Sequence, residues 1–155
     1  IELDGRTAAY ELRDLFPERK KVFDTPKPTQ LVEKVLSYAT SRNALVLDSF
    51  AGSGTTAHAV MNLNAKDDGQ RRFILVECES YADDLTRERV RRVLVGVPSP
   101  SDGSASAGVG GSFTYCTLGD PVELDRILTG ENLPEFRALG AVLFHMATSQ
   151  PLALD

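Results

Sequence analysis

The sequence has few of the residues that mark metal-binding, disulfide-rich or membrane proteins. Its two cysteines, Cys78 and Cys116, stand in unrelated contexts and form no metal-binding spacing with its two histidines, His58 and His145. A disulfide framework is therefore not expected, and this cysteine usage fits a reducing cytoplasm. No apolar run is long enough to span a membrane and no signal-peptide pattern is present, so we expect no membrane partner.

Basic side chains are scarce in the last third of the chain. The 155 residues are 42% hydrophobic and 25% charged, which suits a packed domain, and 17 Lys and Arg against 22 Asp and Glu give a net charge of -5. Residues 1–95 hold 15 basic and 15 acidic side chains, whereas residues 96–155 hold 2 and 7. Because small nucleic-acid binders are usually basic, a nucleic-acid partner requires a basic surface from another segment. Since the chain starts with Ile1 rather than Met, we expect an excerpt of a longer protein or a processed product.

Apolar spacing predicts an α/β fold in the first two thirds of the chain. Two short apolar runs, residues 44–47 and 72–76, indicate buried strands that end in Asp48 and Glu77. The strand–helix–strand–helix order is typical of a parallel sheet. Helical periodicity predicts helices over residues 7–16, 29–39, 56–63 and 81–95.

The composition changes after residue 95. Twelve of the 17 residues from 96 to 112 are Gly, Ser or Pro, which predicts a flexible loop. Beyond it, we expect an edge strand over residues 112–118 and helices over 121–128 and 133–146, the last of them strongly apolar. The chain is thus divided into residues 1–95, 96–112 and 113–155.

The turn after the first strand has the clearest chemical pattern. It reads Asp48-Ser49-Phe50-Ala51-Gly52-Ser53-Gly54-Thr55-Thr56, where two glycines allow positive φ and close backbone approach. A phosphate-binding P-loop is excluded because Thr55 stands where a lysine is required. A dinucleotide fingerprint requires a third glycine where Ala57 stands. An S-adenosylmethionine loop fits the pattern, with Asp48 placed to accept a hydrogen bond from the ammonium group of the cofactor.

A second acidic strand end supports a nucleoside ligand. Glu77 follows Gly54 by 23 residues, and a carboxylate about 20 residues beyond the glycines holds the ribose hydroxyls in dinucleotide-binding folds. The same geometry would serve the ribose of S-adenosylmethionine. The alternative is a plain strand–helix corner in which Asp48 and Glu77 are solvated.

The chain resembles the modification subunits of type III restriction–modification systems, which are site-specific DNA adenine methyltransferases of the β class. The resemblance lies in Phe23-Asp24-Thr25-Pro26-Lys27-Pro28, in residues 46–60 and in residues 73–77, and it is loose after residue 96. It implies a partial Rossmann-like S-adenosylmethionine-dependent methyltransferase sheet with a helical C-terminal extension. The cofactor-binding residues that we predict from the loop and the resemblance together are Lys27, Pro28, Asp48, Phe50, Ala51, Gly52, Ser53, Gly54, Thr55, Thr56 and Glu77.

The catalytic Asp-Pro-Pro-Tyr motif of that family is missing. The only Asp-Pro pair is Asp120-Pro121, which is followed by Val122 and lies on the wrong side of the glycine loop. We therefore expect no catalytic residue and interpret the chain as the cofactor-binding half of a DNA adenine methyltransferase. The resemblance implies DNA contacts through upstream regions, an upstream catalytic half, a second modification subunit and a restriction subunit as partners.

Two other functions stay open. The chain could be a non-catalytic interaction module from a split or decayed methyltransferase, or, more weakly, part of a nicotinamide-dependent enzyme. For the remaining polar residues, structural roles are favoured. We expect His58 to pack within its helix, His145 to lie in a core or interface, and the arginines from Arg87 to Arg92 to form a solvated helix face.

Overall fold

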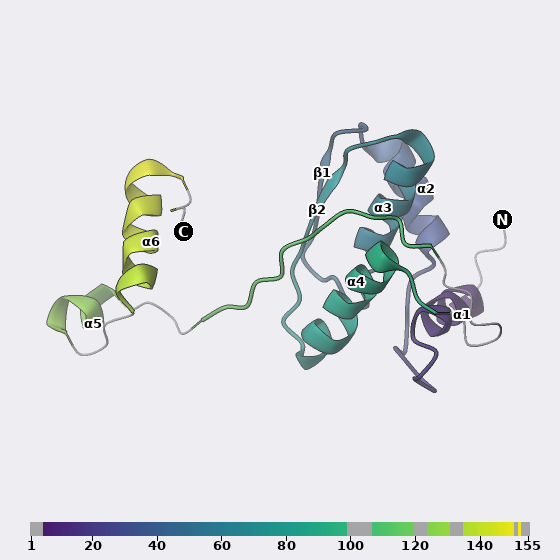
Figure 1. Ribbon diagram of the computed structural model, residues 1–155, viewed down its shortest axis with the longest axis horizontal. Helices are drawn as coiled ribbons and strands as arrows, with labels where there is room; N and C mark the ends of the chain where they lie inside the picture. The colour runs from purple at the N-terminus through teal and green to yellow at the C-terminus, as the bar shows by residue number, and fades with distance from the viewer. Residues whose placement is uncertain (1–4, 99–106, 120–123, 131–134, 151, 153–155) are drawn as a thin grey trace. The chain divides into compact units, whose positions relative to one another are not determined.

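The computed structural model describes residues 5–98, 107–119, 124–130, 135–150 and 152 (Figure 1). The chain divides into two compact units, residues 1–115 and 116–155, and each is described by itself. The second unit holds α5 (Leu124–Thr129) and α6 (Phe136–Thr148). The first unit holds α1 (Gly5–Leu15), α2 (Thr29–Ala39), β1 (Leu45–Asp48), α3 (Thr55–Asp67), β2 (Arg72–Leu75), the 3-10 turn η1 (Ser80–Ala82), the π-helical turn η2 (Asp83–Arg87) and α4 (Glu88–Val95).

The two strands pair in parallel, as their sequence pattern predicts. Leu45 lies opposite Arg72, and Asp48 lies opposite Leu75. The pairing continues past the strand ends, because the Val76 N–H donates to the Asp48 carbonyl at 2.9 Å and the Ala51 N–H donates to the Val76 carbonyl at 3.1 Å. These bonds hold the segment after β2 directly beside the turn after β1. The α/β class is confirmed, and a larger Rossmann-like sheet stays a prediction.

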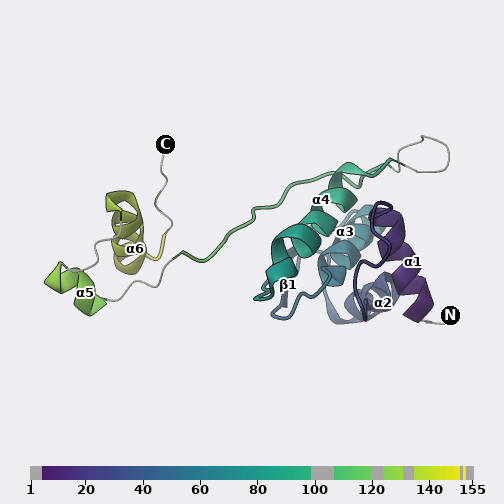
Figure 2. The ribbon, with the colours of Figure 1, turned by 90° about the horizontal axis from the view of Figure 1, so that it is seen from below.

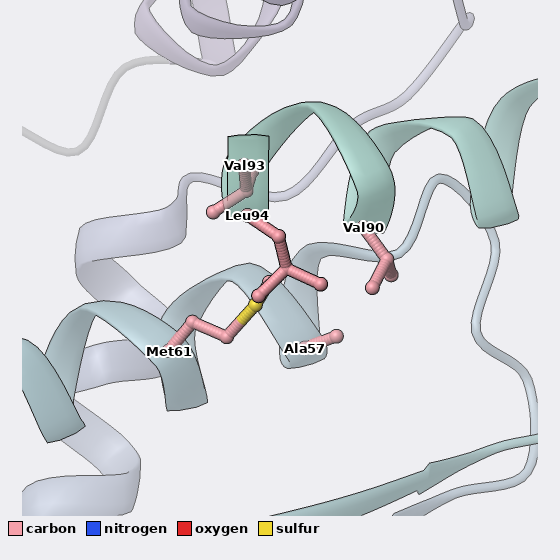
Figure 3. Close-up of a cluster of buried hydrophobic side chains, with 5 residues drawn as sticks. All are labelled: Ala57, Met61, Val90, Val93 and Leu94. Atoms are coloured by element: carbon pink, nitrogen blue, oxygen red, sulfur yellow. The ribbon is translucent and has the colours of Figure 1, made fainter. Parts of the chain in front are cut away.

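The core lies between the sheet and the helices α2, α3 and α4, which Figures 1 and 2 show gathered on one side of the strands. Ala57 and Met61 on α3 pack against Val90, Val93 and Leu94 on α4, and Figure 3 shows this cluster. A second cluster joins α2 to α3 through Leu36, Ala59, Val60 and Leu63. Small side chains on α3 bring the neighbouring helices close.

Only one face of the sheet is buried. Val46, Phe73 and Leu75 pack against the helices, whereas Leu47 is 64% exposed and Leu45 is also exposed. The prediction of buried strands therefore holds for one face only, and an exposed apolar face is what we expect of a partial parallel sheet. Parallel sheets normally have both faces covered, so the second face is open to a further layer.

The segment from residue 107 to 115 packs on the helices of the first unit. The N–H groups of Val109 and Gly110 donate to the carbonyls of Val93 and Leu94, each at 3.0 Å, and Phe113 packs against the α3–α4 cluster. The C-terminal end of the predicted flexible loop is thus held in place, while residues 99–106 lie outside the described part. Residues 112–119 form no strand in the structure, so the predicted edge strand is wrong.

The second unit contains the two predicted helices, which end one and two residues later than predicted; their predicted starts lie outside the described residues. Described side chains of α6 are exposed or half-buried within this unit; Phe136 is 90% exposed, and His145 is also exposed. Among the described residues, no helix has the length and apolar character needed to cross a membrane.

Candidate functional site

The loop between β1 and α3 has the conformation that its glycines predict. Gly52 has φ 53° and Gly54 has φ 78°, both in the left-handed region that favours glycine. The Gly54 N–H donates to the Ala51 carbonyl at 2.8 Å, which closes the turn. A Cβ on Gly54 would lie 3.2 Å from the Thr86 carbonyl oxygen, so the close approach of η2 also requires glycine here.

Asp48 holds the two ends of this loop together. Its Oδ1 accepts from the Phe50 N–H at 3.1 Å, and its Oδ2 accepts from the Thr56 hydroxyl at 2.5 Å. The carboxylate thus links the end of β1 to the first turn of α3. The structure brings Asp48 into the loop as the strand pattern predicts, and it gives this carboxylate a role in shaping the turn.

Glu77 reaches the same loop from the end of the neighbouring strand. Its Oε2 accepts from the Gly52 N–H at 2.7 Å, and its Oε1 accepts from the N–H groups of Cys78 and Glu79 at 2.9 and 3.1 Å. Burial raises the pKa of this carboxyl, but the N–H groups of Glu79, Gly52 and Cys78 outweigh it and hold the pKa below its ordinary value. Glu77 is therefore an ionised acceptor beside the glycine loop.

Aromatic side chains flank the loop. Phe50 is 86% exposed at its outer side. The rings of Phe23 and Tyr81 meet edge to face, with centroids 5.3 Å apart and planes at 77°. A Cβ on Gly52 would come no closer than 3.7 Å to any neighbouring atom, and that atom is Cζ of Phe23. A methyl group on Gly52 would therefore fit in ordinary van der Waals contact with the Phe23 ring.

The Lys27-Pro28 segment lies against the start of α3. The Lys27 carbonyl oxygen is 3.5 Å from the Thr55 hydroxyl, and Pro28 immediately precedes α2. The Lys27 side chain is exposed. The fold therefore brings the Lys27-Pro28 segment and the glycine loop together, as predicted, although the contacting residues Lys27 and Thr55 are 28 residues apart in sequence.

Arg89 is the residue of this site that the sequence analysis missed. The charge pattern of residues 87–92 predicts a solvated helix face, but Arg89 is only 1% exposed. Its Nη1 donates to the hydroxyls of Ser53 and Thr55 at 3.1 and 3.0 Å, and its Nη2 donates to the Thr29 hydroxyl at 2.9 Å. Its sequence position does contain a signal, because buried Leu85 and Val93 stand four residues before and after it.

His58 packs against this arginine as a neutral side chain. Burial, together with the positive charge of Arg89, lowers the pKa of His58 from 6.5 to about 3. Because a guanidinium can only donate, the Nδ1 of His58 accepts from Nη2 of Arg89 at 3.1 Å. The expected packing role of His58 agrees with this contact.

Two cavities of about 310 Å³ each lie elsewhere on the first unit. One is lined by residues of α1 and the start of α2, among them Pro28, and the other by residues of α3, β2 and the segment 109–112. Neither is lined by residues 48–56. Within the loop, Ala51, Ser53 and Thr55 are buried, whereas Phe50 is exposed.

Comparisons with known proteins place these features in one family. A family model described as DNA methylase matches residues 6–88, which include the loop, Glu77 and the Lys27-Pro28 segment. The Mod subunit of the type III restriction-modification enzyme StyLTI of Salmonella typhimurium is 46% identical over 97 residues, covering 54% of this chain and 15% of that protein. The Mod subunit of EcoP15I, a type III enzyme of Escherichia coli, is 48% identical over 84 residues, covering 54% and 13%.

A longer match extends into the C-terminal region. The Mod subunit of the type III enzyme EcoPI of Escherichia phage P1 is 33% identical over 142 residues, covering 83% of this chain and 22% of that protein. The chain thus spans less than a quarter of the length of each of these relatives.

Proposed function

We propose, given that the chain belongs to the DNA methylase family, that residues 48–56 and Glu77 hold S-adenosylmethionine for the methylation of adenine in DNA. The observation that carries this proposal is the bond between the Glu77 carboxylate and the Gly52 N–H, at 2.7 Å. It joins the acidic end of one parallel strand to the glycine loop of the next. Nucleoside cofactors bind at such strand ends in α/β folds.

The residues of the site fit this cofactor. The cofactor would lie beside Gly52, where a Cβ would make only ordinary van der Waals contacts with Phe23, and we call this position the ligand space. Glu77 is ionised, and three N–H groups occupy three of the roughly four acceptor positions of its carboxylate, which leaves one position for a ribose hydroxyl. The positive end of α3, which begins at Thr55, favours a negatively charged group of the ligand.

The remaining predicted ligands fit around this arrangement. Asp48 would accept from the ammonium group of the cofactor through its free lone pairs, and Lys27, Pro28 and exposed Phe50 would line the outer side. S-adenosylmethionine, when bound, supplies the methyl group that the exocyclic amine of adenine accepts. Because this amine is itself nucleophilic, we expect no covalent enzyme intermediate.

The catalytic half and the DNA contacts lie in other parts of the protein under this proposal. The relatives are named Mod subunits of type III enzymes, and we propose a second modification subunit and a restriction subunit as partners, in the cytoplasm.

An adenine inside duplex DNA must be extruded before it can react. We propose that the rest of the methyltransferase domain covers the open sheet face at Leu45 and Leu47 and supplies that pocket.

Calorimetric titration with S-adenosylmethionine tests the proposal. The chain is titrated alone and joined to the catalytic portion of a type III Mod relative, and Gly52→Asp is compared with Gly119→Asp. Gly52→Asp places a charged side chain in the ligand space beside Glu77, and we expect it to weaken binding at least about tenfold. A Cβ on Gly119 meets no atom within 4 Å, so that control should bind like the wild type. No wild-type binding in the joined protein would refute the proposal.

The second candidate, a non-catalytic interaction module, is favoured by α6. This helix exposes Phe136, Leu143 and Met146 within its own unit, and an exposed apolar helix face is typical of an interaction site. The DNA upstream of the coding segment separates the two functions. An in-frame Asp-Pro-Pro-Tyr motif supports the enzyme, and a stop codon followed by a separate start codon supports the module.

A further inference from the structure

We propose that Arg89 is a positioning residue that fixes the glycine loop against the Lys27-Pro28 segment in the conformation that binds the cofactor. The inference rests on the proposed function and assigns a role to a residue that would not itself touch S-adenosylmethionine. Its evidence lies in the partners of the guanidinium, in the way its charge is compensated and in the position of its contacts along the chain.

The guanidinium of Arg89 joins both sides of the candidate site. One nitrogen, Nη1, donates to the Ser53 carbonyl at 3.4 Å and to the hydroxyls of Ser53 and Thr55 at 3.1 and 3.0 Å. The other, Nη2, donates to the hydroxyl of Thr29, the residue directly after Lys27-Pro28, at 2.9 Å. The rigid planar fork of arginine sets the distance between these two groups.

The rest of the loop is tied to the same helical segment. The Thr86 hydroxyl, three residues before Arg89, donates to the Gly52 carbonyl at 2.6 Å. The Thr55 hydroxyl, which accepts from Arg89, lies 3.5 Å from the Lys27 carbonyl. Gly52, Ser53 and Thr55 are therefore all held from η2 and α4, while Asp48 and Glu77 hold the loop from the strand ends.

The charge of Arg89 is compensated less directly than that of a second buried arginine, Arg71. Arg71 makes a bidentate pair with Asp67, with both nitrogen–oxygen distances at 3.0 Å. The carboxylate in the ion pair of Arg89, Glu11, is 3.9 Å away, and the Nε of Arg89 has no hydrogen-bond partner among the described residues. Burial lowers the pKa of Arg89 to about 10.

A charge buried in this way adds little to the free energy of unfolding, because the cost of removing it from water offsets its attraction to the distant carboxylate. An apolar side chain of similar volume often stabilises a fold as much as such a charge. Glu11 is itself engaged by the Thr29 hydroxyl at 2.7 Å and by the Thr29 N–H at 3.3 Å. The hydrogen bonds of Arg89 go instead to neutral groups of the loop, of Thr29 and of His58. An apolar side chain could fill the same volume, but it could not hold the loop and Thr29 at fixed positions through hydrogen bonds.

The test compares Arg89→Met with Arg71→Met in the same protein used for the calorimetric titration. Both substitutions replace a buried guanidinium by an apolar side chain of similar length, but only Arg89 contacts the loop. We expect Arg89→Met to raise the Kd for S-adenosylmethionine at least about tenfold, since it removes charge-assisted bonds to the loop. Arg71→Met should lower the melting temperature and leave this Kd within about twofold.

Two further variants separate positioning from general stability. Thr29→Val removes an acceptor of Arg89 that is not among the predicted cofactor ligands; it should raise the Kd in the wild type, but it should have no further effect in Arg89→Met. Arg89→Lys keeps the charge and should restore part of the affinity. Amide hydrogen exchange at residues 52–55 should accelerate in Arg89→Met and stay unchanged in Arg71→Met.

Each result decides between the two proposals. Wild-type binding with an unchanged Kd in Arg89→Met overturns the positioning role and leaves the proposed function standing. An equal rise of Kd in Arg71→Met also overturns it, because loss of stability would then explain both variants. Absence of binding in the wild type overturns both proposals.

Discussion

Replacing Gly54 by alanine tests the packing of the glycine loop most directly. Gly54 has φ 78°, and a Cβ built on it lies 3.2 Å from the Thr86 carbonyl oxygen and 3.5 Å from Cγ2 of Thr86. Gly52 offers a matched comparison, because its φ of 53° is equally left-handed but its Cβ would meet atoms only at 3.7 Å and beyond. The two substitutions share the backbone strain, and only one adds a steric contact.

The magnitude follows from these two contributions. A side chain in the left-handed region costs about 1–2 kcal/mol, and crowding in a packed site costs about 1–3 kcal/mol more. We therefore expect Gly52→Ala to lose about 1–2 kcal/mol of unfolding free energy and Gly54→Ala about 2–5 kcal/mol. For a unit of this size, each kcal/mol lowers the melting temperature by about 4–8 °C.

Urea unfolding followed by circular dichroism measures this difference. Gly140→Ala serves as a control, because Gly140 lies inside α6, a Cβ there meets no atom within 4 Å, and alanine favours the helix. This control should leave the unfolding of the first unit unchanged. If Gly54→Ala destabilises no more than Gly52→Ala, the close approach of Thr86 to the loop is refuted.

Two more predictions concern acid stability and association. The pKa of His58 is 6.5 in the unfolded chain and about 3 in the folded one, so its contribution to the free energy of unfolding is complete above pH 6.5 and is lost on acidification by up to about 1.4 kcal/mol per pH unit. His58→Gln should flatten the dependence of unfolding free energy on pH between pH 6 and 4, measured by urea unfolding. An unchanged slope would refute this prediction. Because the sheet exposes Leu45 and Leu47, we expect the isolated chain to associate in light scattering, and Leu47→Lys should reduce this association. Val46→Lys, on the packed face, should instead unfold the chain. A monodisperse wild type would contradict this prediction.

The elements and the loop were predictable because their determinants are local. Periodic apolar residues predict the helices and the two strands, and paired glycines at a strand–helix corner predict positive φ. The approach of Glu77 to Gly52 also follows, since neighbouring parallel strands end at the same edge of a sheet. These features depend on residues close in sequence or on one strand pairing.

The buried charges were not predictable from local pattern. Arg89 is buried because Thr29, 60 residues away, and Ser53, 36 residues away, supply acceptors for its guanidinium. Glu33 is buried on α2 in the same way, because Asn62 and Lys66 of α3 bind its carboxylate. Partners that only the tertiary fold brings together decide whether such a side chain is solvated or enclosed.

The glycines after residue 95 can reflect either a flexible chain or close packing of the backbone. Richness in glycine predicted flexibility, yet a Cβ on Gly108 would lie 2.1 Å from the Leu94 carbonyl oxygen. The glycine therefore allows the backbone to lie against the end of α4, where Val109 and Gly110 satisfy helix carbonyls. Composition alone does not separate freedom of the chain from close packing.

The side chains that the sequence indicated as cofactor ligands also build the loop itself. Asp48 bonds the Phe50 N–H and the Thr56 hydroxyl, and Glu77 bonds the Gly52 N–H. Replacing either acid would therefore remove a ligand and loosen the loop at once. Gly52 offers a test that keeps both acids in place, because Gly52→Ala adds backbone strain whereas Gly52→Asp also adds a charge in the ligand space. The ratio of their Kd values for S-adenosylmethionine thus measures the effect of a charged side chain in the ligand space while Asp48 and Glu77 are unchanged.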